Sequence, residues 1–149
     1  MNASVRRLGT APLRAIEMPE FFAPAPLVAV GLMALNDHVL KARFHNAATG
    51  KLSDLAACFF LPLLVSGVLG LVVRGRLGWR LAAGAVVTAA VFVALELSDA
   101  AGAVFARVCT TLGGPLGVHR VVLTRDLTDL LALAVIPLAC LQALRGGRE

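Results

Sequence analysis

The sequence predicts an all-α integral membrane protein, a four-helix bundle made of two helical hairpins. Three observations lead to this fold class. The chain is 58% hydrophobic and 15% charged, with a mean hydropathy of +0.83, whereas a soluble domain has about 25% charged residues with which to cover its surface. Four apolar segments approach the roughly 20 residues that cross a bilayer. Two of these segments begin with similar sequences, which indicates an internal repeat.

A single transmembrane domain is expected over 1–149, beginning with a cytoplasmic segment at 1–20. This first segment has no apolar core before Phe21, so it is not a cleavable signal peptide. Its basic residues are Arg6, Arg7 and Arg14.

Helices are expected over the four apolar segments, each ending where polar residues gather. Their approximate bounds are 21–40, 52–73, 79–97 and 127–144, with outer loops at 41–51 and 98–126. The stretch 100–108 in the second loop is apolar. It either extends the third helix or dips back into the membrane.

The basic residues predict the orientation. The turn at 74–80 is short and purely basic, and such turns stay in the cytoplasm. Both chain ends then lie on the same side of a multi-pass protein. The net charge of +5 comes from short basic clusters between apolar runs, not from the continuous basic face that nucleic acid requires. The expected partners are therefore the lipid bilayer and, in view of the small size, further copies of the chain.

The repeat relates 49–63 to 124–138, where seven of fifteen positions are identical at an offset of 75. The matches include Asp54 with Asp129 and Pro62 with Pro137. Two spans per repeat keep both copies in the same orientation, as in a parallel repeat. Convergence of two similar hairpins is the alternative.

Polar side chains are expected to gather on the outer side, while the inner side keeps few acids. The chemistry is thus predicted to be one-sided. The candidate binding cluster consists of Asp37, His38, Asp54, Glu96, Asp99, Arg120, Arg125 and Asp129.

Three of these acids have specific interpretations. Asp54 and Asp129 either cap the helices that they open, by accepting backbone N–H bonds, or serve a function, because a carboxylate inside a bilayer is costly. Glu96 ends its helix at the unfavourable end of the helix dipole. It therefore needs a cation, a proton or a buried hydrogen bond. Arg107, Arg120, Arg125 and Lys51 are the candidate partners.

No metal and no cofactor are predicted. The three cysteines form no CxxC pair. His38 and His45 are seven residues apart, which is not a strong metal-ligand spacing. Asp37 and Lys41, four residues apart on one helix, are expected to pair.

From about 51 to 140 the layout resembles the small VanZ-like membrane proteins. The resemblance lies in Lys51 with Asp54, then Glu96, then Arg120, then Asp126 or Asp129. The family's His one turn after the Asp is absent here, the Gln after the Glu becomes Asp99, and the last helix lacks the family's Asn and Gly. The resemblance implies a role at the cell envelope in the bacterial inner (plasma) membrane, in some members resistance to glycopeptide antibiotics. It implies no mechanism.

Three function classes follow. The first is an envelope protein whose outer cluster binds a cation, a lipid headgroup or a partner protein. The second is a membrane-embedded enzyme acting on a lipid-linked substrate, with His38, His45 or His119 as base and Arg120 or Arg125 holding phosphate. The third is an ion-conducting or membrane-disrupting effector. Whether the protein is an enzyme stays open at this point.

Overall fold

The computed structural model describes residues 18–44, 47–73, 75–116, 121, 123 and 125–146, and within these ranges it contains helices and no strand. The first elements are α1 (Pro19–Phe22), α2 (Pro24–Leu35), the π-helix η1 (Asn36–Leu40) and α3 (Lys41–Phe44). The two longest helices follow, α4 (Ala47–Val72) and α5 (Leu77–Leu97). The last elements are α6 (Asp99–Gly113), the 3-10 helices η2 (Gly114–Leu116) and η3 (Leu127–Val135), and α7 (Ile136–Gly146).

Three described helical segments are long and apolar enough to cross a membrane, as judged by length and composition. They are Ala48–Val72, Leu77–Leu97 and Leu127–Gly146, the last formed by η3 and α7 together. The chain is accordingly a multi-pass membrane protein in character. The segment expected at 21–40 is not one uninterrupted α-helix, because α2 has 12 residues and gives way to the π-turn of η1.

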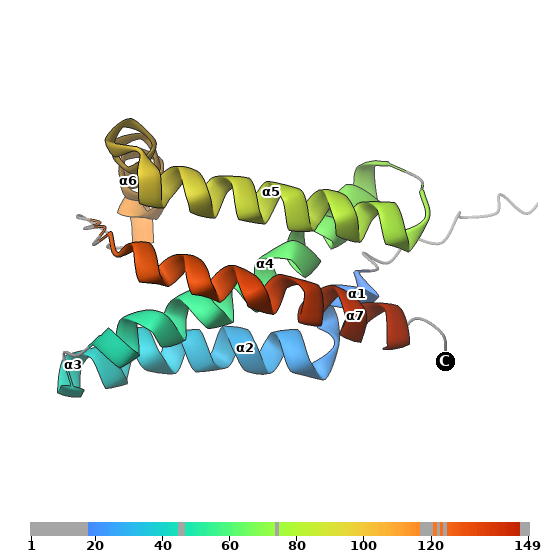
Figure 1. Cartoon of the computed structure of the whole chain (residues 1–149), viewed down its shortest axis with the longest axis horizontal. Helices are drawn as coiled ribbons and strands as arrows, with labels where there is room; N and C mark the ends of the chain where they lie inside the picture. The colour runs from blue at the N-terminus through green and yellow to red at the C-terminus, as the bar shows by residue number, and fades with distance from the viewer. Residues whose placement is uncertain are drawn as a thin grey trace, which may run out of the picture.

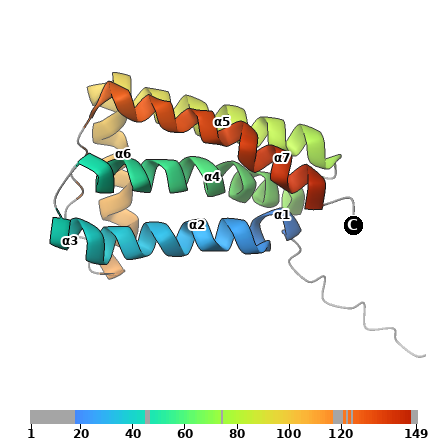
Figure 2. The same ribbon diagram turned by 60° about the horizontal axis from the view of Figure 1, so that its bottom comes forward.

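The long helices lie side by side, with α4 in the centre (Figures 1 and 2). Helix α4 contacts α1, α2, α5 and α7. Helix α1, the turn between α4 and α5 and the end of α7 lie at one end of the bundle, here called the α1 end. Helices α3 and α6 and the start of η3 lie at the opposite end, the α6 end.

The core joins α4, α5 and α7. One cluster of buried residues is Leu63, Leu81, Ala139 and Ala143, and a second is Cys58, Ala132 and Ile136. Small residues bring the helices close, as is common between membrane helices. A Cβ built on Gly84 would lie 2.2 Å from the backbone oxygen of Pro62. The backbones of α4 and α5 can approach each other this closely only because residue 84 is a glycine and has no Cβ.

The two expected outer loops are largely helical. Helix α4 begins at Ala47, so the polar residues at 49–51 continue the helix beyond its apolar run. A hydropathy pattern marks only the apolar part of such a helix. In the second loop, Ser98 leaves helical geometry and its side chain accepts a hydrogen bond from the Ala101 N–H at 3.2 Å. It thereby ends α5 and caps α6, which runs crosswise at the α6 end rather than extending α5 (Figure 2).

The π-turn of η1 brings a buried amide against α4. Asn36 is fully buried, and its Nδ2 donates to the Thr49 backbone oxygen at 2.5 Å and to the Ser53 Oγ at 2.7 Å. These bonds tie the first hairpin together near the α6 end. Single π-turns are rare and often occur at functional sites.

Candidate functional site

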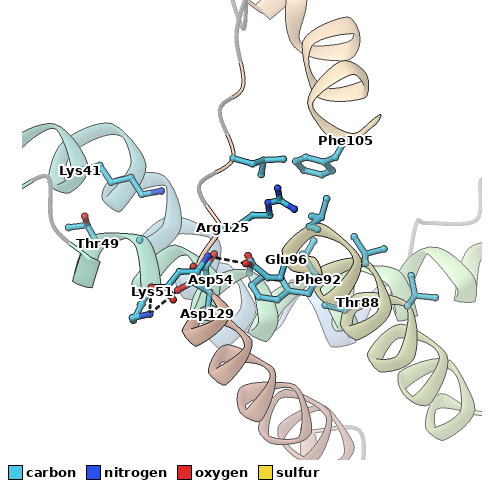
Figure 3. A pocket seen from close by; sticks show the side chains of 18 of the residues that line it. Lys41, Thr49, Lys51, Asp54, Thr88, Phe92, Glu96, Phe105, Arg125 and Asp129 are labelled. Carbon is cyan, nitrogen blue, oxygen red and sulfur yellow. Dashed lines mark hydrogen bonds and ion pairs between the residues drawn. The ribbon is translucent and has the colours of Figure 1, made fainter. Parts of the chain in front are cut away.

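A pocket of about 970 Å³ lies between α4, α5 and the start of η3, towards the α6 end (Figure 3). Its wall changes character along the bundle. Near the α6 end the lining is charged, with Lys41, Lys51, Asp54, Glu96, Arg125, Asp126 and Asp129. Further along α4 and α5 it is apolar, with Ala57, Leu61, Val65, Val87, Val91, Phe92 and Leu95.

Lys51 of α4 binds residues at the start of η3. These are the two segments whose sequences resemble each other. Its Nζ lies 2.9 Å from Asp129 Oδ1 and 3.6 Å from Asp126 Oδ2, and it also donates to the Thr128 hydroxyl. Asp126 is the residue that caps η3, because its Oδ1 accepts the Thr128 N–H at 2.9 Å. This bond, the Thr128 hydroxyl and the Lys51 charge hold the pKa of Asp126 below its usual value. Asp129 therefore pairs with Lys51 and does not cap the helix.

Glu96 finds a partner that the sequence did not suggest. Its Oε2 accepts a hydrogen bond from the backbone N–H of Asp126 at 3.1 Å. None of the described cationic candidates, Lys51, Arg107 and Arg125, pairs with it. The bond fastens the end of α5 to the start of η3, and the second oxygen of Glu96 has no hydrogen-bond partner within the described part of the chain.

Arg125 forms an ion pair with Asp99, the first residue of α6. The pair lies at the rim and is open to solvent, since the Asp99 side chain is 89% exposed. Arg125 also lines the pocket, beside Phe105 of α6 (Figure 3). The contact connects the crosswise helix to the segment that leads into η3.

Asp54 lines the pocket and does not cap α4. The helix begins at Ala47, so Asp54 lies two turns inside it. It makes no hydrogen bond or ion pair with another described residue. The Asp129 and Glu96 carboxylates repel its charge, while Lys41 and Lys51 attract it. Asp54 is thus a half-buried carboxylate facing a cavity without a direct partner in the described part of the chain.

Three described residues of the predicted cluster, Asp37, His38 and Asp99, do not line the pocket. Asp37 pairs with Lys41 at 2.7 Å, which confirms the expected contact, and it accepts the Ser53 hydroxyl at 2.7 Å. His38 is exposed on η1 and does not line the pocket. Arg120 lies outside the described residues, as do His45 and His119.

Thr88 is a pocket residue that the sequence reasoning missed. It is 5% exposed, and its Oγ1 has no hydrogen-bond partner among the described residues. It is the only polar side chain between Leu81 and Leu95. That isolation in an apolar run is the signal that could have pointed to it.

The α1 end holds a polar contact that the sequence reasoning did not predict. Glu20 of α1 forms an ion pair with Arg80 of α5, with Nη2 3.2 Å from Oε1, and the Ser66 hydroxyl donates to the same oxygen at 2.9 Å. Gly70 leaves room for the guanidinium, since a Cβ there would collide with Arg80 Nη1. Each partner is close to an apolar run, and 60 residues separate them, so no local pattern shows the pair.

No family model, no curated protein and no solved structure matches the chain. Within the ranges that the structure describes, no three His, Cys, Asp or Glu side chains are placed to hold a metal ion. The lining of the pocket combines a charged rim with a largely apolar interior.

Proposed function

We propose that this chain is a multi-pass protein of the bacterial inner membrane, with four spans, that binds an amphiphilic molecule in the pocket between α4, α5 and η3. The observation that carries the proposal is the change in the pocket wall from charged at the α6 end to apolar further in. An amphiphile has the same two parts in the same order. The volume of about 970 Å³ also lies within the range of small-molecule sites.

The position of the pocket along the helices supports a ligand from the lipid phase. Glu96 lies at the end of the candidate span Leu77–Leu97, whereas Val87 lies nine residues further in. At 1.5 Å per residue this separation is about 14 Å, so the charged rim would lie near the headgroups and the apolar wall among the acyl chains. A lipid in one leaflet would contact the charged rim with its headgroup and the apolar wall with its acyl chains, without leaving the bilayer.

The fourth span is the stretch of α2, η1 and α3. It packs along α4 and also exposes large apolar side chains. The exposed residues are Leu27, Val28, Leu32, Leu35 and Val39. A lipid environment accounts for this surface, because in water these side chains would form an exposed apolar patch. With four spans and a basic 74–80 turn, both termini are cytoplasmic and the pocket faces the outer leaflet.

The residues of the VanZ-like resemblance support a shared site. Lys51, Asp54, Glu96, Asp126 and Asp129 all line the pocket, although they are spread over three helical elements. Membership of that family is part of the proposal. Of the three histidines considered for an enzymatic role, His38 lies outside the lining, and His45 and His119 lie outside the described residues. A conducting path is not favoured either, since the wall beyond the charged rim is apolar.

A filled pocket tests the proposal. Ala57→Trp places an indole inside the pocket from the α4 wall, whereas Ala90→Trp adds the same group to an exposed position of α5 outside the lining. Lipid retained by the purified protein in mild detergent is measured by native mass spectrometry, and binding of a fluorescent lipid is titrated. Ala57→Trp should weaken binding about tenfold or more, and Ala90→Trp should leave it unchanged.

Folding of each variant is checked by thermal unfolding. If Ala57→Trp is unfolded, the smaller change Val91→Phe takes its place, since Val91 is a half-exposed lining residue. Equal lipid binding by the wild type, the pocket variants and Ala90→Trp would overturn the proposal.

A further inference from the structure

Resting on the proposed function, we infer that the amphiphile carries an ammonium group, which Asp54 and Glu96 hold at the charged rim. A lipid with an ethanolamine headgroup has this chemistry. Three features of the pocket support this assignment. Its cations are already paired, and two of its carboxylates come from facing helices. A hydroxyl deeper in the pocket has no partner among the described residues.

The cations of the pocket lining are already engaged. Lys41 pairs with Asp37, and Arg125 pairs with Asp99; neither acid is part of the lining. Lys51 is occupied as well, by Asp129 with Asp126 and Thr128 beside it. The lining therefore presents little free positive charge in the described part of the chain.

The carboxylates of Asp54 and Glu96 are in the opposite situation. Asp54 makes no direct contact with a described cation, and among the described residues Glu96 accepts only the backbone N–H of Asp126. They come from facing helices, α4 and α5, and both point into the pocket (Figure 3). Their charges repel each other. A cation between them would convert this repulsion into two attractions, and an ammonium group has three N–H donors for the purpose.

Thr88 supplies an independent indication of a ligand. Its side chain is 5% exposed and lines the pocket, yet its hydroxyl has no partner in the described residues. A buried hydroxyl without a partner has lost its hydrogen bonds to water and gained none in return, which is unfavourable. Thr88 lies eight residues from Glu96 on α5, about 12 Å along the helix. An ester or amide oxygen between the headgroup and the acyl chain could accept this hydroxyl while the ammonium group lies at the rim.

The test compares two lipids with identical acyl chains. Phosphatidylethanolamine carries a phosphate and an ammonium group, whereas phosphatidylglycerol carries the phosphate alone. Wild-type protein should prefer the ethanolamine lipid about tenfold. The double variant Asp54→Asn with Glu96→Gln should lose this preference, and its binding of phosphatidylglycerol should be no weaker than that of the wild type, because two negative charges that repel this anionic lipid are removed.

Arg107→Gln is the control, because it removes an exposed charge of α6 that lies outside the pocket lining and makes no ion pair with a described residue. Its lipid preference should equal that of the wild type. Thr88→Val removes the hydroxyl while keeping a side chain of similar size. It should weaken the binding of both lipids by a similar factor. If the double variant does not fold, Asp54→Asn alone is measured, since Asp54 makes no hydrogen bond that the substitution would break within the described structure.

The outcomes separate this inference from the proposed function. Equal binding of the two lipids by the wild type, combined with weaker binding by Ala57→Trp, overturns the ammonium inference and leaves the amphiphile site intact. If every pocket variant binds both lipids as the wild type does, both the ammonium inference and the amphiphile site are overturned. If soluble phosphoethanolamine competes as strongly as the lipid does, the pocket recognises an ammonium group, but its ligand is a water-soluble molecule.

Discussion

The two ends of the bundle hold ion pairs of the same chemical kind in opposite surroundings. At the α1 end, the side chains of Glu20 and Arg80 are 2% and 15% exposed, and Ser66 completes the contact. At the α6 end, the side chains of Arg125 and Asp99 are 36% and 89% exposed. The first pair is enclosed by α1, α4 and α5, whereas the second lies on the rim of a cavity.

This difference separates a structural role from a binding role. Breaking a buried pair leaves an uncompensated charge, which costs roughly 3–5 kcal/mol. An exposed pair contributes about 0.2–1 kcal/mol and is screened by salt. The α1 end can therefore hold the N-terminal helix in place, while charges at the α6 end remain free to exchange partners with a ligand.

The largest effect is expected at the α1 end. Arg80→Ala should lower the free energy of unfolding by roughly 3–5 kcal/mol, because Glu20 would keep its charge without a cation. Arg76→Ala is the control, since Arg76 is exposed and makes no ion pair with a described residue. Reversible unfolding in mixed micelles measures both. A difference of less than about 1 kcal/mol between the two would remove the structural role of the pair.

An intermediate effect is expected where α4 and α5 meet. Gly84→Ala would place a Cβ 2.2 Å from the Pro62 backbone oxygen, so the helices must separate. Such overpacking costs about 1–3 kcal/mol. Gly78→Ala on the same helix meets no atom within 4 Å and is the control. If Gly84→Ala unfolds like the control, the close approach of α4 and α5 at this position does not contribute to stability.

The smallest effect is expected at the α6 end. Arg125→Ala should cost less than about 1 kcal/mol in low salt, and the difference from the wild type should shrink at high salt because the pair is exposed. Arg107→Ala, an exposed arginine of α6 without a described ion pair, controls for general charge loss. A loss as large as that of Arg80→Ala would erase the contrast between the two ends.

Much of the fold is visible in the sequence because lipid imposes length and apolarity on whole segments. The predicted helices at 52–73, 79–97 and 127–144 correspond to α4, α5 and η3 with α7. Their polar ends were missed, since residues such as Thr49 and Lys51 extend a helix into water without changing its apolar pattern. The π-turn at Asn36 and the crosswise α6 depend on tertiary contacts and a local cap, so hydropathy could not specify them.

The candidate site was visible as a set of residue types but not as a set of contacts. Asp54, Glu96, Arg125 and Asp129 do line one pocket. Their partners could not be derived, because Glu96 accepts from a backbone N–H, which every residue except proline offers. The Glu20 pair was missed for a related reason. Its only sequence trace is the Ser66, Gly67 and Gly70 group, small residues within an apolar run that make room for Arg80 and Met18.

Helix α6 gives the two ends of the molecule different widths, because it lies across one end only (Figure 2). Val104, Val108 and Leu112 form an exposed apolar stripe along it. A helix of this kind lies flat, with its apolar face among the outer parts of the acyl chains. The protein would then occupy more area in one leaflet than in the other and act as a wedge. Such a shape favours curved regions of a membrane, whatever molecule the pocket holds.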